Sequence, residues 1–483
     1  MLFVRFCLHF IAQRIPPGNS WDDREIEMER TRSKSQSRMR RRVVLFPLPL
    51  QGHITPMLQL GSILHNKGLS ITIIHTTFNS PNSANYPHFD FRSIPDGLSE
   101  AVVSVADAVA VMTHVNDNCV EPFRESLSNL LSNVEEEPIA CLITDAMLHF
   151  TQSVADSLKL PRIVLRTSNI SSFLVFAGTR LLYEKGYFPI KDPLSDAPVV
   201  EFPPLRVKDI PVVETHDPVK SKHLLLSMIG QTKASSGLIW NSLEEIEQDA
   251  VTTLKMEFPI PVFTIGPFHQ YFPATSSSLV SQDRSCISWL DKQAPKSVIY
   301  VSFGSIVGIT ETEFLEIAWG LAKSGVPFLW VVRPGSVHGA EWLEALPEGF
   351  LEMLEGKGHI VQWAPQQEVL AHPATGGFWT HNGWNSTLES ICEGVPMICH
   401  PSFGDQTVIA RYVSDVWRVG LHLEKKLERG EIERAVKRLI LEDEGQEMRN
   451  RIMYLKEKVD ISLRPGGSAY QALENLVHYI QSF

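Results

Sequence analysis

The sequence predicts an α/β protein with two Rossmann-like domains, each built on a parallel sheet. Short, fully apolar runs alternate with helical stretches in both halves of the chain, which is typical of strands covered by helices on both faces. The length of 483 residues suits two or three domains, and the 43% hydrophobic and 20% charged content is that of an ordinary globular protein. The run from Gly266 to Asp283 contains prolines and serines but no periodicity, which indicates a domain boundary.

The first domain begins with the apolar run Val43 to Phe46, which is followed by a loop and a helix that contains Pro56. Because proline is tolerated only in the first helical turn, this helix is predicted to start at about His53 or just after. Gly68 ends the helix, and Ile71 to His75 is the next strand. This order is the start of a doubly wound sheet. Further strands are expected at Ile139 to Thr144, Arg162 to Leu165 and Leu238 to Trp240.

The second half repeats the alternation of apolar runs and helical stretches, so a second parallel sheet is expected. Its strands are predicted at Ser297 to Phe303, Phe328 to Val332, His359 to Trp363, Gly377 to Thr380 and Val395 to Cys399. Its helices are predicted after Thr310, after Pro365, at Asn385 to Cys392, from Ile432 to Lys458 and at Ala469 to Gln481.

These elements predict five parts of the chain. Residues 1–41 form a disordered or extraneous extension, because the first 42 residues carry ten Lys and Arg against five Asp and Glu and have no periodic apolar face. An N-terminal Rossmann-like domain (42–267), a linker (268–283) and a C-terminal Rossmann-like domain (284–464) follow. The last helix (465–483) is expected to pack back on the N-terminal domain.

Charge and composition limit the classes of molecule that the protein is expected to bind. The net charge is −11 although the first residues are basic, so the body of the protein is acidic, which argues against nucleic acid or an anionic membrane as partner. No apolar run reaches the roughly 18 residues that a membrane span requires. The six cysteines are scattered without metal-ligand spacing, as expected for reduced thiols in a cytoplasmic protein. A monomer is expected.

The stretch from Trp363 to Gln406 carries most of the chemical information. It is dense in Trp, His, Asn, Ser and acidic residues set between short apolar runs. Gly383 lies between the strand and the helix expected from about Asn385, and the helix begins with unpaired backbone N–H groups at the positive end of its dipole. Such a helix start binds phosphate. A dinucleotide oxidoreductase would also suit two such domains, but no G-x-G-x-x-G motif follows Phe46 or Phe303.

The same stretch resembles the C-terminal signature of plant family-1 UDP-dependent glycosyltransferases. The shared features are the leading WAPQ, HNGWNS, a glutamate three residues later and the closing GDQ. The motifs QGHITPMLQL, LITDA, SSGLIWNSLEE, YVSFGS and FLWVVRPG extend the resemblance, nearest to the subgroup containing glucosyltransferases of cytokinins and steviol glycosides. The resemblance implies a GT-B fold, in which two Rossmann-like domains face a cleft, the acceptor binding mainly to the N-terminal domain and the UDP-sugar to the C-terminal one.

Donor-site roles follow from the resemblance. Trp363 offers a flat face for uracil with Ala364 and Gln366 beside it, and Glu389 lies where a carboxylate accepts the ribose hydroxyls. The pyrophosphate would be held by His381, Asn385, Ser386 and, from the opposite wall, Ser305, and the sugar by Trp384, Asp405 and Gln406. A terminal glutamine favours glucose, with UDP-xylose and UDP-arabinose as rival donors. No clustered D-x-D motif is present, so neither a metal nor a cofactor is expected.

His53 is the predicted general base. The positive end of a helix dipole disfavours the imidazolium ion and keeps the ring able to accept a proton. Asp145 follows another strand and is placed to hold the far ring nitrogen, which fixes the tautomer. The resemblance makes the same assignment and implies an inverting glucosyltransferase that forms β-glucosides on a hydroxyl, carboxyl or amine. A helix-capping role for His53 and a turn role for Asp145 are the structural alternatives.

The acceptor pocket is the least determined part. Side chains that follow strand ends or lie in loops near the expected cleft are the candidates, and a mostly apolar wall suggests a small lipophilic plant metabolite. Packing is the alternative for each of them. The candidates are Phe46, Met112, His114, Thr167, Ser168 and Phe173. A non-catalytic protein that binds a UDP-sugar or a small molecule on the same fold is the alternative function.

Overall fold

The structure is a computed structural model that describes residues 41–98, 108–133, 136–188, 190, 195–212, 218–272 and 279–483. The expected N-terminal extension lies outside the described residues except for Arg41, and residues 273–278 of the expected linker also lie outside them. Within the described chain no helix is both long and apolar enough to cross a membrane.

The N-terminal half is built on a seven-stranded sheet with the order β3-β2-β1-β4-β5-β6-β7, in which all the recorded strand pairs are parallel. Its central strands are buried along almost their whole length, as their apolar sequence requires. The strands are β1 (Arg42–Phe46), β2 (Ser70–Thr76), β3 (Phe89–Ile94), β4 (Ile139–Asp145), β5 (Arg162–Arg166), β6 (Gly237–Trp240) and β7 (Val262–Thr264).

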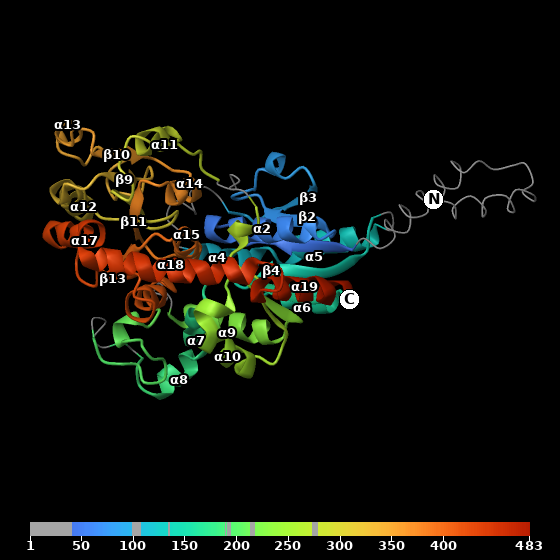
Figure 1. Cartoon of the computed structure of the whole chain (residues 1–483). Coiled ribbons are helices and arrows are strands. Elements are labelled where there is room, and N and C mark those ends of the chain that lie inside the picture. Colours follow the sequence, from blue (N-terminus) through green and yellow to red (C-terminus); the bar gives the residue numbers. More distant parts are fainter. Residues whose placement is uncertain are drawn as a thin grey trace, which may run out of the picture.

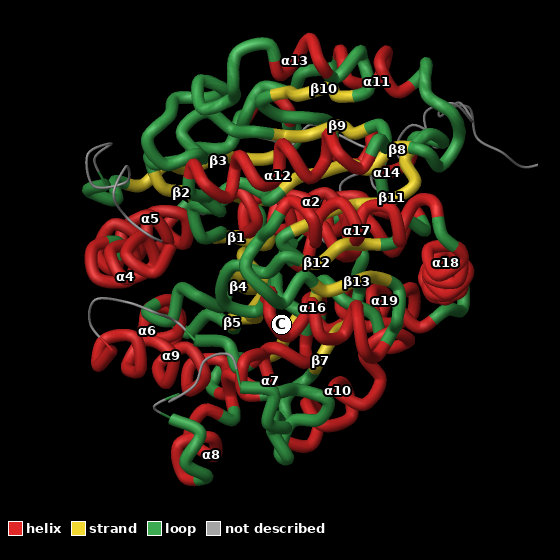
Figure 2. Tube along the Cα trace, turned by 90° about the vertical axis from the view of Figure 1, so that its left-hand side faces the viewer, coloured by secondary structure: helices red, strands yellow, loops and turns green. Residues whose placement is uncertain are grey.

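Helices cover this sheet on both faces (Figure 1). Two of them, α4 and α5, lie side by side near β3, as Figure 2 shows. The helices are α2 (Gln51–Asn66), α4 (Ala108–Asn118), α5 (Val120–Ser132), α6 (Thr151–Ser157), α7 (Ile170–Ala177), α8 (Thr179–Glu184), α9 (Pro218–Lys233) and α10 (Glu244–Glu257).

The predicted start of α2 is wrong by about one half-turn. The helix begins at Gln51, so Pro56 lies in its second turn rather than its first. Proline lacks the N–H that would bond to the carbonyl four residues earlier, which is that of Gly52. That carbonyl instead accepts a hydrogen bond of 2.9 Å from the Asn385 side chain. A partner from another domain therefore satisfies the group that the proline leaves open.

The C-terminal half holds a six-stranded sheet with the order β10-β9-β8-β11-β12-β13, again parallel in every recorded pair. Thr310 and Glu313 cap the first long helix reciprocally, and Gly325 ends it at a positive φ of 68°. The strands are β8 (Val298–Ser302), β9 (Phe328–Val331), β10 (Gly358–Val361), β11 (Thr375–Thr380), β12 (Met397–Cys399) and β13 (Gly420–His422). The helices are α11 (Ser285–Leu290), α12 (Glu311–Ser324), α13 (Phe350–Met353), α14 (Gln366–Ala371), α15 (Trp384–Glu393), α16 (Gln406–Arg411), α17 (Arg429–Leu441), α18 (Asp443–Leu463) and α19 (Ser468–Gln481).

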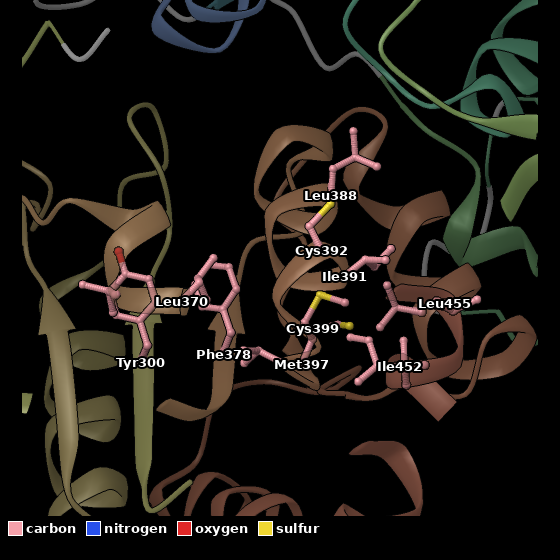
Figure 3. Packing of buried hydrophobic residues seen from close by; sticks show 14 of the residues in the cluster. Tyr300, Leu370, Phe378, Leu388, Ile391, Cys392, Met397, Cys399, Ile452 and Leu455 are labelled. Carbon is pink, nitrogen blue, oxygen red and sulfur yellow. The ribbon is translucent and has the colours of Figure 1, made fainter. Parts of the chain in front are cut away.

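One hydrophobic cluster holds α15 in place. Leu388 and Ile391 of α15 pack with Met397 of β12 and with Ile452 and Leu455 of α18 (Figure 3). These side chains are buried, so the position of the α15 N-terminus is set by a rigid core rather than by a surface loop.

The last two helices return to the N-terminal half. Helix α18 runs across the molecule to α19, which lies beside β4 (Figure 1). Leu473, Leu476 and Ile480 of α19 belong to the same buried cluster as strands β1 and β4. The end of the chain thus completes the N-terminal core and links it to the C-terminal half.

Candidate active site

A cavity of about 360 Å³ lies between the two halves, a size typical of small-molecule sites. Residues from the start of α2 and from the loop after β5 line one side, and residues from the loops after β8, β10, β11 and β12 line the other. The C-terminal ends of parallel strands carry the sites of such folds. The cavity wall includes His53 and all the donor-side residues that the sequence predicts: Ser305, Trp363, Ala364, Gln366, His381, Trp384, Asn385, Ser386, Glu389, Asp405 and Gln406.

His53 lies in the first turn of α2 and is paired with Asp145 at the end of β4. The His53 Nδ1 and Asp145 Oδ2 atoms are 2.7 Å apart, and the Asp145 side chain is 1% exposed whereas that of His53 is 19% exposed. The second carboxylate oxygen accepts a hydrogen bond of 2.9 Å from the Met147 backbone N–H. With its Nδ1–H donated to Asp145, the ring has Nε2 as its proton acceptor.

The environment of His53 tunes its basicity. Burial of the ring works against the charged form, but the Asp145 carboxylate, through its charge and its hydrogen bond, outweighs burial, so the pKa of His53 lies above its ordinary value of 6.5. Thr167 Oγ1 lies 3.2 Å from the same nitrogen that faces Asp145. These contacts hold one ring orientation and make the imidazole a stronger base.

Helix α15 presents its N-terminus to the cavity. Gly383 precedes it and has no side chain to cap the first N–H groups, and among the described residues no side-chain cap of this helix start is recorded. His381 packs between two glycines, since a Cβ on Gly304 or Gly383 would lie 2.6 or 2.5 Å from its ring. Burial lowers the pKa of His381 to about 4, so the ring is neutral at pH 7. The arrangement can bind an anion through backbone dipoles and neutral donors.

Glu389, in the middle of α15, is held by two glutamines. Gln366 Nε2 donates to it at 2.6 Å and Gln367 Nε2 at 3.0 Å. Burial raises the pKa of Glu389 above its ordinary value, and these two hydrogen bonds oppose the rise. Gln366 also donates to Ser386 at 2.9 Å. The sequence did not identify Gln367, although its place directly after Gln366, in the first turn of a helix, was the available signal.

Asp405 and Gln406 line the cavity at the start of α16. Burial raises the pKa of Asp405 to about 6, and the charge of His53 opposes this rise. The Gln406 side-chain oxygen accepts hydrogen bonds from the backbone N–H groups of Ser402 and Phe403, at 2.8 and 3.2 Å, which fixes the orientation of its amide. Gln282 of the expected linker and Arg284, the first residue of the expected C-terminal domain, also line the cavity, and no motif had indicated them.

Two of the acceptor predictions are wrong. Phe46 is fully buried with its ring stacked on Phe123 at 4.5 Å between centroids, and Phe173 is fully buried against Trp240 and Phe258. Both rings fill helix–sheet cores instead of the cavity. Proximity to a strand end places a residue near the cleft, but the direction of its side chain depends on the packing around it.

Of the other four acceptor candidates, one lines the cavity and three do not. Thr167 lines the cavity beside His53, whereas Ser168 uses its carbonyl to accept a hydrogen bond from the Trp240 indole. Met112 packs against the N-terminal core, and His114 Nε2 lies 2.9 Å from the carbonyl oxygen of Asp96. Ser168, Met112 and His114 are not among the residues that line the cavity. Only Thr167 therefore joins the predicted base there.

Comparison with known proteins identifies the family to which the chain is similar. The family model described as "UDP-glucoronosyl and UDP-glucosyl transferase" matches residues 90–458. The chain is 56% identical over 441 residues to UDP-glycosyltransferase 76B1 of Arabidopsis thaliana, covering 91% of this chain and 98% of that protein. It is 48% identical over 450 residues to UDP-glycosyltransferase 76G1 of Stevia rebaudiana, covering 92% and 97%.

Solved structures of plant glycosyltransferases share the fold. The structure of Phytolacca americana UGT2 complexed with UDP-2fluoro-glucose and pterostilbene superposes with a TM-score of 0.77 and 28% identity, covering 91% of this chain and 99% of that chain. These matches confirm the predicted α/β class with two Rossmann-like domains and the resemblance found in the motifs. The chain belongs to the plant family-1 UDP-glycosyltransferases and is a glycosyltransferase.

Proposed function

We propose that this enzyme transfers glucose from UDP-glucose to a hydroxyl group of a small lipophilic plant metabolite with inversion, giving a β-glucoside. A carboxyl or amine is the alternative nucleophile. The observation that carries the proposal is the paired His53 and Asp145, which faces the same cavity as the uncapped N-terminus of α15. A base on one wall and an anion site on the other suit a single displacement between them.

The proposed step is one in-line substitution. The acceptor O–H gives its proton to His53 Nε2 as its oxygen attacks the anomeric carbon of glucose. The bond between that carbon and the β-phosphate oxygen breaks, and the electron pair leaves with UDP. The imidazolium ion that forms is stabilised by Asp145, which is 2.7 Å from the opposite nitrogen. Attack from the side opposite the leaving group inverts the configuration.

The leaving group is stabilised by the C-terminal wall, which is the side of the cavity formed by the loops of the C-terminal half. Negative charge grows on the β-phosphate as the bond breaks, and the N–H groups of α15 with His381, Asn385, Ser386 and Ser305 line the cavity there. Fixed donors aimed at developing charge lower the barrier. No metal takes part in this proposal.

A donor panel tests the sugar. Glucose is proposed because Gln406, with its amide held by Ser402 and Phe403, closes the motif on the cavity wall beside Asp405. The related structure of UGT2 holds UDP-2fluoro-glucose. We expect UDP-glucose to have the highest kcat/KM among UDP-glucose, UDP-xylose, UDP-arabinose and UDP-galactose. A preference for a pentose donor would replace glucose in the proposal.

An acceptor panel tests the reaction. UDP release with UDP-glucose is measured across flavonoid, diterpenoid and cytokinin acceptors, and the product configuration is read by NMR. A β-linked product supports inversion, whereas an α-linked product contradicts it. Tight UDP-glucose binding without turnover on any acceptor would indicate a non-catalytic binding protein.

Trp363 is predicted to contribute to UDP affinity. It follows β10, lines the cavity and also packs against the C-terminal core. Base–aromatic stacking contributes about 1–3 kcal/mol, so Trp363→Ala is expected to weaken UDP binding by about 5–150-fold in calorimetric titration. Trp363→Phe keeps an aromatic face and should lose less. Unchanged UDP affinity in the alanine variant would show that uracil lies elsewhere.

Asp145→Asn is predicted to shift the pH dependence. Asp145 raises the pKa of His53, and the base acts in its deprotonated form, so the acidic limb of kcat/KM reflects that raised pKa. Removal of the carboxylate charge lowers the pKa, so the limb moves to lower pH. The plateau rate falls by about 10²-fold or more, because the amide no longer stabilises the imidazolium ion. A limb that stays in place would contradict the pairing.

A further inference from the structure

Asn241 follows β6 in the N-terminal half and does not line the cavity, yet it contacts the donor helix. It is 2% exposed. Its side-chain oxygen accepts a hydrogen bond of 2.9 Å from the Phe268 backbone N–H, and its side-chain NH₂ donates to Asn385 Oδ1 at 3.2 Å. Its carbonyl accepts a hydrogen bond of 2.7 Å from the Trp384 indole. One buried residue thus joins the domain boundary to the first two residues of α15.

These contacts determine two amide orientations in turn. The backbone N–H of Phe268 can only donate, so it faces the oxygen of Asn241, and the NH₂ of Asn241 must face Asn385. Asn385 therefore presents its oxygen to Asn241 and its NH₂ to the Gly52 carbonyl at 2.9 Å. A flipped Asn385 amide would set oxygen against oxygen and NH₂ against NH₂.

The chain of contacts ends next to the base. Gly52 directly precedes His53, and its carbonyl accepts the Asn385 hydrogen bond where Pro56 provides no helical N–H. The anion-binding end of α15 and the first turn of α2 are thereby connected through Asn385. Asn241 controls this connection without facing the substrate.

We infer that Asn241 is a positioning residue that holds the Asn385 amide in the orientation that connects the donor helix to the base-bearing helix. This inference rests on the proposed function. Transfer depends on the separation between His53 and the anomeric carbon, and small misplacements of reacting groups cost much rate. UDP affinity depends chiefly on the C-terminal wall. Loss of the connection therefore lowers kcat with little change in UDP affinity.

Asn241→Asp tests the inference with little change in volume. The oxygen that accepts from Phe268 is kept, while the donor that faces Asn385 becomes an acceptor. We expect kcat with UDP-glucose to fall by about 10–100-fold, and the Kd for UDP, measured by calorimetry, to change by less than about threefold. Asn241→Ala removes the donor without adding charge and gives the same separation of kcat from Kd, which covers the case in which the aspartate variant does not fold.

Ser235→Ala is the matched control. Ser235 is buried two residues before the other end of the same strand, where its hydroxyl donates to the Thr232 and Gly237 carbonyls. Its removal is expected to lower Tm while kcat is unchanged. The inference is overturned if the Asn241 variants keep wild-type kcat, or if kcat and UDP affinity fall together in them.

Hydrogen–deuterium exchange gives a readout that is independent of the sugar and the acceptor. UDP binding to the wild-type protein is expected to slow amide exchange in the first turn of α2, and Asn241→Asp should abolish that slowing while still binding UDP. Protection of α2 that persists in the variant contradicts the inference. Failure of the wild-type protein to bind UDP would instead contradict the proposed function.

Discussion

His53→Ala should reduce turnover of hydroxyl acceptors by about 10²–10⁴-fold, the usual contribution of a general base. The substitution removes the only atom of the pair that faces the acceptor, because Asp145 is 1% exposed behind the ring. UDP binding should survive, since the anion-binding end of α15 lies on the other wall of the cavity. Initial rates with UDP-glucose and calorimetric titration with UDP measure the two effects separately.

His65→Ala is the matched control for this experiment. His65 lies in the last turn of the same helix, where its ring stacks on His88 at 5.4 Å between centroids. The same substitution at this end of α2 should leave kcat unchanged. Equal loss of turnover and UDP affinity in the His53 variant would indicate a structural role and would remove the base from the mechanism.

Arg411→Met should give a large loss of stability. Arg411, at the end of α16, forms a two-pronged ion pair with Asp209 of the N-terminal half, at 2.8 and 3.0 Å, and both side chains are 2% exposed. Removal of one partner leaves a buried charge uncompensated, which costs about 3–5 kcal/mol. The thermal midpoint, measured at a fixed scan rate, should fall substantially.

The double variant Arg411→Met with Asp209→Leu separates two explanations. Replacement of both charges by apolar groups removes the buried uncompensated charge, so part of the lost stability should return. The contacts of Arg411 with Asp415 and Glu424, and of Asp209 with the Arg206 backbone N–H, remain lost in the double variant. A double variant as unstable as the single one would mean that the uncompensated charge of Asp209 is not the main cause of the lost stability. Arg434→Met is a suitable control, because Arg434 pairs with Glu431 on the surface and exposed pairs contribute about 0–1 kcal/mol.

Much of the scaffold is predictable from local pattern. The central strands are continuous apolar runs between loops, and each expected run corresponds to an observed strand, from β1 to β12. The missed strands are β3, β7 and β13. All three lie at an edge of their sheet and are short or partly exposed. Strand β3 in particular includes the exposed Arg92 and Ser93, so its sequence has no periodic apolar pattern.

The residues of the donor wall could be predicted from the sequence, whereas most residues of the acceptor wall could not. Apart from Ser305, the predicted donor residues belong to one nearly continuous stretch and share one motif, and all of them line the cavity. The acceptor wall is assembled from separate loops, and for Phe46 and Phe173 the direction of the side chain was decided by core packing against Phe123 and Trp240. Motif spacing cannot report on contacts between segments that only the fold brings together.

The sequence by itself determined the fold class, the family and the chemical types gathered at the site, because apolar periodicity and motif spacing are local properties of the chain. Tertiary structure alone decided that Asn241 holds the Asn385 amide and that Arg411 is buried against Asp209, whereas the contact of Asp145 with His53 was already expected from the sequence. In each pair the partners are far apart in the chain. Their hydrogen bonds exist only after burial removes water as the competing partner, and that burial depends on the packing of both domains.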